Sequence, residues 1–250
     1  ILACVNGEIL PADQAKVSIW DRGFVFGDSV YEVFRLYDGR CWLEDQHIAR
    51  LKRSLKELDF VPLDLNRLME RSYRTIEASG IREGMLYLQI TRGAAIRSHP
   101  FPDPPVEPTE VIVVRPYDDA KTSAARREGV RLISLPDLRW KRCDIKTTNL
   151  LANVLANEAA RRAGAFEAVL VDSSGYVTES THTSLLWYRG GRLEGTPEGD
   201  EILPGTTRQF TLTLAEKLEI PFKECRVTLD ELLNAEEIIL VGTTTEVVSV

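Results

Sequence analysis

Hydrophobic and polar positions alternate along the chain in short runs that predict β-strands. The clearest run, residues 30–36, has a period of two, so Tyr31 and Val33 lie on one face of the predicted strand. Glu32 and Phe34 then lie on the opposite face. Tyr31 is therefore either a half-buried strand aromatic or a hydroxyl directed into a site.

The rest of the first half adds a hairpin, helices and another strand to this pattern. Asn6-Gly7 is a strong turn signal between two short strands. Leucine and isoleucine recur at helical spacing over residues 44–60, and a second helix over residues 64–79 ends before a glycine. Residues 85–93 form an apolar strand that also terminates at a glycine.

A polar stretch at residues 119–129 separates this half from a second set of elements, and we interpret it as a connector between two domains. The expected domains are residues 1–118 and residues 130–250. In the second domain the pattern predicts strands at 129–135, 166–172, 185–188 and 237–241 and helices at 150–163 and 209–218. The mixture of strands and helices in both halves predicts an α/β (α+β) fold.

Composition and charge narrow the possible functions. With 250 residues, 44% hydrophobic and 28% charged, the chain has the composition of a soluble globular protein, large enough for two modest domains that share a cleft. A net charge of −7 argues against nucleic acid as a partner, and no apolar run is long enough to span a membrane. The four cysteines are scattered without metal-binding spacing, so we expect a cytoplasmic protein without a metal site.

Lys146 is the first candidate for chemistry, because it stands beside Asp144 at the start of an apolar helical pattern. Only a neutral lysine amine attacks a carbonyl group to form a Schiff base. The nearby cations Arg139, Lys141 and Arg142 favour the neutral amine, since like charges disfavour a further protonated group. The alternative is an ordinary solvated lysine on the surface.

A proline-rich loop holds the second candidate, a pair formed by Arg97 and His99. Five prolines between Pro100 and Pro108 leave the loop few conformations, so it is stiff. An arginine offers a planar fork of two donors and a histidine offers a further donor, which suits recognition of a carboxylate. The alternative is a surface loop with incidental charges.

An acid and two threonine clusters complete the candidates. Glu179 stands among hydroxyl residues between two predicted strands and is either a buried acid or an exposed turn residue. Thr206 and Thr207 follow a glycine at a predicted helix start, where N–H groups and the helix dipole favour an anion or phosphate. The alternative is an ordinary threonine N-cap. Thr243 and Thr244 follow a second glycine after the last long strand.

Together these signals supply what a pyridoxal phosphate enzyme needs: a Schiff-base lysine, an acid for the ring nitrogen, a phosphate seat and a carboxylate clamp. The sequence also resembles the fold-type IV pyridoxal-phosphate aminotransferases, which include branched-chain aminotransferases, D-amino acid aminotransferases and aminodeoxychorismate lyases. The matching segments occur in the family's order and cover nearly the whole chain. They are residues 21–28, 31–33, 47–51, 146–151, 177–179, 203–208 and 242–246.

The resemblance implies a role for each candidate toward pyridoxal 5'-phosphate. Lys146 carries the cofactor and moves the proton between substrate and cofactor. Glu179 pairs with the pyridine nitrogen, and Arg139 lies near the ring hydroxyl. Arg50 binds the phosphate together with the four threonines of the two clusters.

The resemblance also implies the fold and the assembly. A smaller N-terminal α/β domain and a larger C-terminal pseudo-barrel domain hold the cofactor in the cleft between them. Tyr31, Arg97 and His99 hold the substrate α-carboxylate, and the last two reach across from the neighbouring subunit of a homodimer. The family continues beyond a sequence like residues 246–250, so we expect the C-terminal end to be incomplete.

Within the family, the segments 91–99 and 139–146 are most similar to the D-amino acid aminotransferases. We therefore expect ping-pong transfer of an amino group from a D-amino acid such as D-alanine or D-glutamate to 2-oxoglutarate or pyruvate. A branched-chain L-amino acid aminotransferase and an aminodeoxychorismate lyase are the alternatives. A non-catalytic protein that binds a phosphorylated ligand is a remote one. Gly242 stands where D-specific relatives often carry serine.

Overall fold

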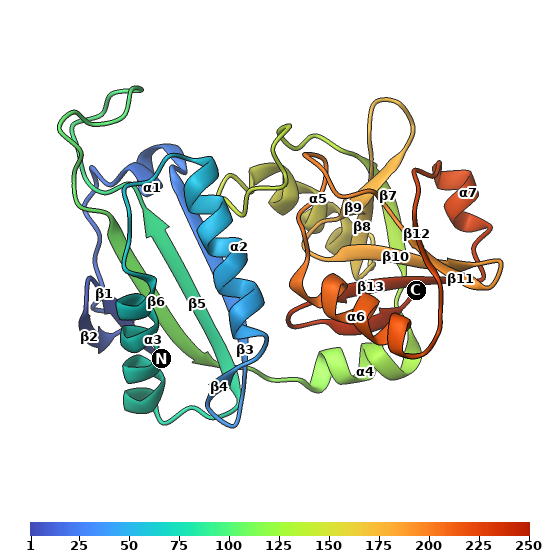
Figure 1. The fold of residues 1–250 in the computed structure, drawn as a ribbon, viewed down its shortest axis with the longest axis horizontal. Helices are drawn as coiled ribbons and strands as arrows, with labels where there is room; N and C mark the ends of the chain where they lie inside the picture. The colour runs from blue at the N-terminus through green and yellow to red at the C-terminus, as the bar shows by residue number, and fades with distance from the viewer. The chain divides into compact units, whose positions relative to one another are not determined.

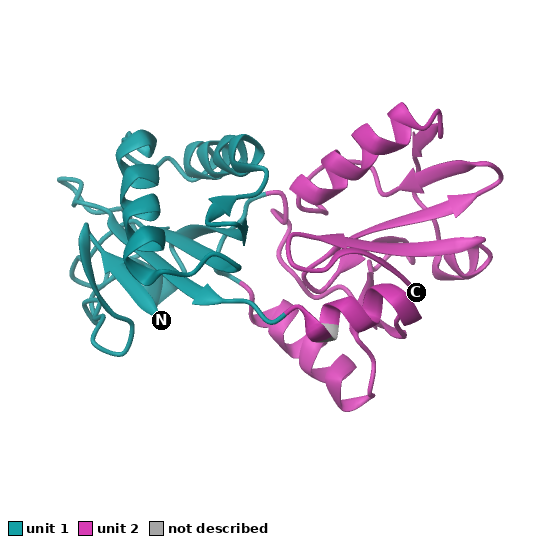
Figure 2. Ribbon diagram, turned by 90° about the horizontal axis from the view of Figure 1, so that it is seen from below, with its two compact units in different colours: residues 1–118, 145–149 teal, residues 119–144, 150–250 magenta. Residues whose placement is uncertain are grey.

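The chain forms two compact units in the computed structural model, which describes residues 1–250 except the side chain of Lys121. The first unit contains residues 1–118 and 145–149, and the second contains residues 119–144 and 150–250 (Figure 2). The short segment 145–149 includes Lys146. It packs within the first unit although the chain on both sides of it belongs to the second.

An antiparallel sheet with the strand order β2-β1-β6-β5-β3-β4 forms the centre of the first unit (Figure 1). Its strands are β1 (Leu2–Val5), β2 (Glu8–Pro11), β3 (Ser29–Tyr37), β4 (Arg40–Cys41), β5 (Gly84–Thr91) and β6 (Thr109–Pro116). The hairpin predicted at Asn6-Gly7 joins β1 to β2, with both turn residues at positive φ. The alternation in β3 is confirmed, since Glu32 and Phe34 are fully buried while Tyr31 and Val33 are half-buried.

The helices α2 (Glu44–Glu57) and α3 (Leu65–Ser79) lie on one face of this sheet (Figure 1). Leu51 of α2 and Leu68 of α3 pack with Phe34 and Leu88 of the sheet in one apolar core. This burial of apolar surface is the main stabilising contribution in the unit. A short helix, α1 (Arg22–Phe26), precedes β3, and Gly27 ends it in the left-handed conformation.

Two further sheets form the second unit, one with the order β12-β11-β10-β13-β14 and the other with the order β7-β8-β9. The strands are β7 (Leu132–Pro136), β8 (Glu167–Val171), β9 (Val177–Ser180), β10 (Ser184–Arg189), β11 (Arg192–Gly195), β12 (Phe222–Glu224), β13 (Glu237–Gly242) and β14 (Glu246–Ser249). The parallel strands β7 and β8 are connected through helix α5 (Leu151–Arg162). Trp187 and Leu240 are fully buried in the core of this unit. The predicted mixed α/β class is confirmed.

The remaining helices of the second unit are α4 (Ala120–Glu128), α6 (Thr206–Lys217) and α7 (Leu229–Leu233). Helix α4 occupies the range interpreted as a polar connector. Alanine and arginine favour helix there, and Ala125 is buried against the unit. Helix α6 begins at Thr206, earlier than the predicted start at residue 209, so the first threonine cluster forms the first turn of a helix. None of the helices in the described part of the chain is long and apolar enough to cross a membrane.

Candidate active site

Lys146 lies in an irregular segment that pairs with β3 in the first unit. Its backbone carbonyl accepts a hydrogen bond from Tyr31 N at 3.0 Å, and its backbone N donates to Ser54 Oγ of α2 at 3.2 Å. Thr147 forms a β-bridge with Val30. The backbone of Lys146 is thus held from both sides, and its half-buried side chain extends from a fixed position.

The ring of Tyr31 lies directly beneath the Lys146 amine. Lys146 Nζ is 4.2 Å from the centroid of the Tyr31 ring, and that ring stacks on Tyr87 with 5.7 Å between the centroids. An aromatic face attracts a cation, so the ring restricts where the protonated amine can lie. Tyr31 is half-buried, which fits both the strand aromatic and the site hydroxyl considered from the sequence.

Arg50 belongs to a buried network with Glu32 and His47, two residues to which we assigned no role from the sequence. Its Nε and Nη2 each donate to the Glu32 carboxylate at 2.8 Å, and His47 Nδ1 lies 2.7 Å from the same group. Burial alone raises the pKa of Glu32, but the charge and hydrogen bonds of Arg50 and His47 outweigh it and bring the pKa to about 2. Burial lowers the pKa of His47. Arg50 is therefore held in one orientation by a carboxylate that stays charged.

Arg97 and His99 lie in the exposed loop after β5, as the sequence predicted. Gly93 begins this loop with φ of +92°, and a Cβ there would lie 2.1 Å from the carbonyl oxygen of Glu107. Only glycine fits this position. The loop therefore leaves the strand at a fixed angle, with both candidate side chains on its surface.

Glu179 is buried within β9, so the exposed-turn alternative is wrong. Its carboxylate pairs with Arg139, which also binds Asp137 through Nε at 3.0 Å and Nη2 at 2.7 Å. The backbone N of Leu203 donates to both Glu179 oxygens at 3.3 Å. Burial raises the pKa of Glu179, and Arg139 only partly opposes this effect because Asp137 shares its charge.

The two glycine-threonine clusters meet at the start of β10. A Cβ on Gly205 would lie 2.5 Å from Ser184 Oγ, and one on Gly242 would lie 3.0 Å from Thr183 Cγ2. Thr183 and Ser184, the residue before β10 and its first residue, therefore lie next to the glycines of both clusters. Thr206 is buried in the first turn of α6, whose N-cap makes no side-chain hydrogen bond.

Two buried hydroxyls lie in the same part of the second unit. Ser180 Oγ and Thr183 Oγ1 have no hydrogen-bond partner among the described residues. A buried polar group without a partner is costly, so such groups point to a ligand or water. Thr243 and Thr244 are half-buried in the turn between β13 and β14.

Sequence reasoning assigned no roles to Glu32, His47 and Asp137. The signals for the first two were present, because Glu32 is on the apolar face of β3 and His47 is one helical turn before Arg50. Two of the three cations expected to act on Lys146 bind carboxylates: Arg139 binds Asp137 and Glu179, and Arg142 binds Asp144. Within the described residues, no group of three or more His, Cys, Asp or Glu side chains could hold a metal ion.

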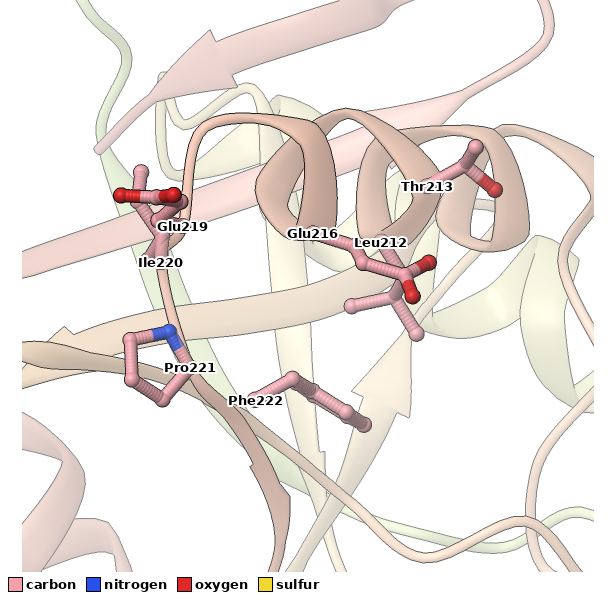
Figure 3. Close-up of a pocket in the computed structure, with 7 residues that line it drawn as sticks. All are labelled: Leu212, Thr213, Glu216, Glu219, Ile220, Pro221 and Phe222. Carbon is pink, nitrogen blue, oxygen red and sulfur yellow. The ribbon is translucent and has the colours of Figure 1, made fainter.

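A separate groove of about 530 Å³ lies beside the C-terminal half of α6 and the start of β12 (Figure 3). Leu212, Ile220 and Phe222 give it a mostly apolar lining, and the carboxylates of Glu216 and Glu219 also line it. Its lining contains no residue of the candidate site among the described side chains.

Comparison with known proteins identifies the family. The family model "Amino-transferase class IV" matches residues 29–250. The D-alanine aminotransferase of Staphylococcus epidermidis is 39% identical over 250 residues, which cover 98% of this chain and 86% of the relative. That of Bacillus licheniformis is 38% identical over 249 residues with the same coverage. The chain therefore belongs to the class IV aminotransferases, and the resemblance seen in its sequence is confirmed.

Solved structures show the same fold. A hypothetical aminotransferase from Mycobacterium tuberculosis in a PLP-bound form has a TM-score of 0.87 and 26% identity, covering 100% of this chain and 90% of that one. The Escherichia coli branched-chain amino acid aminotransferase has a TM-score of 0.89 and 25% identity, covering 100% and 85%. The 4-amino-4-deoxychorismate lyase of Pseudomonas aeruginosa has a TM-score of 0.87 and 28% identity, covering 100% and 90%.

The Glu32 network predicts a specific response of stability to acid. Because the folded pKa of Glu32 is about 2 and its ordinary value is 4.5, the charged carboxylate stabilises the fold above pH 4.5. This contribution, on the order of 3 kcal/mol, is lost as the pH falls from 4.5 toward 2. Urea unfolding of wild type and Glu32→Gln at a series of pH values measures it.

The difference in the free energy of unfolding between wild type and Glu32→Gln should shrink as the pH falls from 4.5 toward 2. The difference between wild type and the exposed control Glu8→Gln should show no such trend. A pH-independent difference would contradict the assignment.

Proposed function

We propose that this protein is a pyridoxal phosphate-dependent transaminase that moves the amino group of a D-amino acid, of the D-alanine or D-glutamate type, to a 2-oxo acid. Membership of the class IV aminotransferases supports the reaction. The observation that carries the substrate class is the 38–39% identity, over nearly the whole chain, to D-alanine aminotransferases. We also infer a cytoplasmic location, which the free thiols of its four cysteines support.

The residues present fit the cofactor. The phosphate needs hydroxyl and N–H donors together with a cation, and the second unit supplies Thr206 and Thr207 at the start of α6. Thr243 and Thr244 lie in the turn after Gly242. The unpartnered hydroxyl of Thr183 beside Gly242 is a further donor that such a group would satisfy. We assign Arg50, held by Glu32, as the phosphate cation.

Glu179 suits the ring nitrogen of the cofactor. Its carboxylate is buried and incompletely balanced by Arg139, so a protonated nitrogen beside it would supply the missing positive charge. In return, the carboxylate keeps that nitrogen protonated. Arg139, fixed by Asp137, then lies beside the ring hydroxyl in our assignment.

Pyridoxal phosphate, when bound, supplies a carbonyl carbon for the amine and a ring that accepts the electron pair released at the substrate Cα. Lys146 would hold the cofactor through its amine. Once the substrate amine has displaced it, the free lysine amine would take the proton from the substrate Cα and deliver it to the cofactor carbon that carries the transferred nitrogen. Its backbone bonds to Tyr31 and Ser54 keep the amine on one side of the substrate. This fixed position of the base makes the reaction stereospecific.

The substrate's handedness depends on where its carboxylate is held relative to Lys146. We assign Tyr31, Arg97 and His99 to that carboxylate, because a guanidinium fork and an imidazole are matched donors for it. The alternatives from the same family are a branched-chain L-amino acid aminotransferase and an aminodeoxychorismate lyase, because solved structures of both kinds of enzyme match this fold with TM-scores of 0.89 and 0.87.

A half-reaction panel tests the substrate class directly. Purified holoenzyme is mixed with D-alanine, D-glutamate, L-leucine or L-glutamate, and the loss of cofactor absorbance in the near-visible range is followed. We expect the D-amino acids to react at least about 100-fold faster than the L-amino acids, a difference of roughly 3 kcal/mol in transition-state stabilisation. Reaction with L-leucine but not with D-alanine would establish the branched-chain alternative.

Replacement of Lys146 tests the catalytic assignment. Lys146→Ala should bind the cofactor without a borohydride-reducible bond, and its turnover should fall by at least about 10⁴-fold because the proton-transferring amine is lost. Lys141→Ala, which removes an exposed lysine from the same stretch of chain, is the control and should keep wild-type turnover. Mass spectrometry after borohydride reduction locates the labelled lysine. Turnover retained in Lys146→Ala would refute the mechanism.

We further propose that the enzyme is a homodimer formed through an apolar surface on the first unit. Ile19, Phe24 and Ile96 are 72%, 74% and 85% exposed, and Trp20 and Phe101 are also exposed. These residues come from two segments, 19–24 and 96–101, which lie side by side because Ala95 N donates to the Trp20 carbonyl at 3.2 Å. Large exposed apolar patches mark interaction surfaces, and an identical second copy is the common partner.

A charge in this patch should prevent assembly. We expect the double variant Ile19→Asp/Ile96→Asp to sediment as a monomer where wild type sediments as a dimer, because an unpaired carboxylate would be buried in the interface. Leu218→Asp, at a site 70% exposed on the second unit, is the control and should remain dimeric. Sedimentation velocity at micromolar concentration distinguishes the two, and a monomeric wild type would exclude the proposed dimer.

A further inference from the structure

Helix α1 binds the backbone of the loop that carries Arg97 and His99. Arg22 Nη1 donates to the carbonyl of Ser98 at 2.6 Å and to that of Pro100 at 3.1 Å. Its Nη2 donates to the carbonyl of His99 at 3.2 Å. One buried guanidinium therefore binds three consecutive peptide groups of the loop.

Arg22 is itself anchored in the body of the unit. Its Nε donates to Asp28 at 2.7 Å, and Asp28 also binds Arg92 Nε at 2.9 Å. Arg92 continues the connection by donating to the carbonyls of Leu58 at 2.6 Å and Asp59 at 3.1 Å, just after α2. The loop backbone is thus tied through two arginines and one carboxylate to the helix that also carries Arg50.

Phe26, at the end of the same helix, contacts both side chains of the predicted clamp. Its ring centroid is 5.4 Å from that of His99, with a tilt of 42° between the rings. The guanidinium carbon of Arg97 lies 5.0 Å from the same centroid, and that of Arg22 lies 4.8 Å from it. Arg97 and His99 therefore share one aromatic surface.

We propose that α1 sets the geometry of the carboxylate clamp, with Phe26 as the positioning residue for Arg97 and His99 and with Arg22 as the anchor of their backbone. This inference rests on the proposed function, because it concerns how a substrate carboxylate is recognised. Exposed arginine and histidine side chains sample many rotamers, and this lost freedom opposes binding. A ring that attracts a cation and stacks with an imidazole limits those rotamers before the substrate arrives.

The test compares variants at Phe26 that keep the apolar volume. Phe26→Leu removes the aromatic face and should raise KM for the D-amino acid donor about 10-fold, because the clamp loses its preset orientation. The value of kcat should change less than about twofold, since Lys146 is untouched. Phe26→Tyr keeps the ring and should stay within about twofold of wild type in both constants. Phe26→Tyr is therefore the matched control, because it changes the same position but keeps the aromatic face.

A second measurement follows the loop without relying on activity. Arg22→Gln removes the donors to the three carbonyls, so amide hydrogen exchange across residues 94–101 should become faster, while exchange in β5 should remain at the wild-type rate. Sedimentation and cofactor absorbance are recorded for every variant, so that loss of the dimer or of the cofactor is recognised as a separate effect.

The outcomes separate the two proposals. Wild-type enzyme that fails to react with D-amino acids refutes the proposed function. An active wild type whose Phe26→Leu variant keeps the donor KM, or whose Arg22→Gln variant keeps slow exchange in the loop, refutes the positioning role alone. A rise in KM that Phe26→Tyr shows equally would also contradict it, because the ring would then not be the feature that matters.

Discussion

Backbone hydrogen bonds between residues 145–149 and β3 are the constraint on which the first unit's chemistry depends. They bring Lys146 to a sheet whose strands come from far earlier in the chain. The same strand supplies Tyr31 beneath the amine and, on its opposite face, Glu32 within the core. One strand therefore holds the backbone of Lys146 and contacts its amine through Tyr31, while Glu32 on its other face holds Arg50, because successive side chains point to opposite faces.

The two buried glutamates show how similar partners produce opposite electrostatic results. Glu32 receives two hydrogen bonds from Arg50 and one contact from His47, so its pKa falls despite complete burial. Glu179 is also paired with an arginine, but Asp137 binds that arginine through several of its donors. Burial therefore outweighs the effect of Arg139 and raises the pKa of Glu179. The charge of the Glu32 carboxylate is balanced by its partners, whereas the charge of the Glu179 carboxylate is balanced only in part.

Much of the fold could be predicted from the sequence, because its elements follow local patterns, whereas the roles of the candidate site residues came from the family resemblance and stay predictions. The alternation of β3, the Asn6-Gly7 hairpin and the helices over residues 44–57 and 65–79 all depend on residues close together in the chain. The mixed fold and the family followed from ordered motifs. The missed features, such as the pairing of Glu32 with Arg50 and of Asp137 with Arg139, depend on side-chain directions after folding. Helix α4 was missed because its charged residues conceal a strong intrinsic preference for helix.

The loop that carries Arg97 and His99 has a consequence for how this enzyme can evolve. Its prolines and its attachment to α1 keep its path constant, while Arg97, Ser98 and His99 are exposed on its surface. Substitutions at its exposed polar positions outside the apolar surface therefore cost little stability, unlike changes in β3 or in the Glu32 network. New acceptance of amino acids can arise there by single substitutions, without first acquiring compensating mutations elsewhere. A stiff loop with exposed polar positions allows substrate preference to change while the segment that holds Lys146 stays the same.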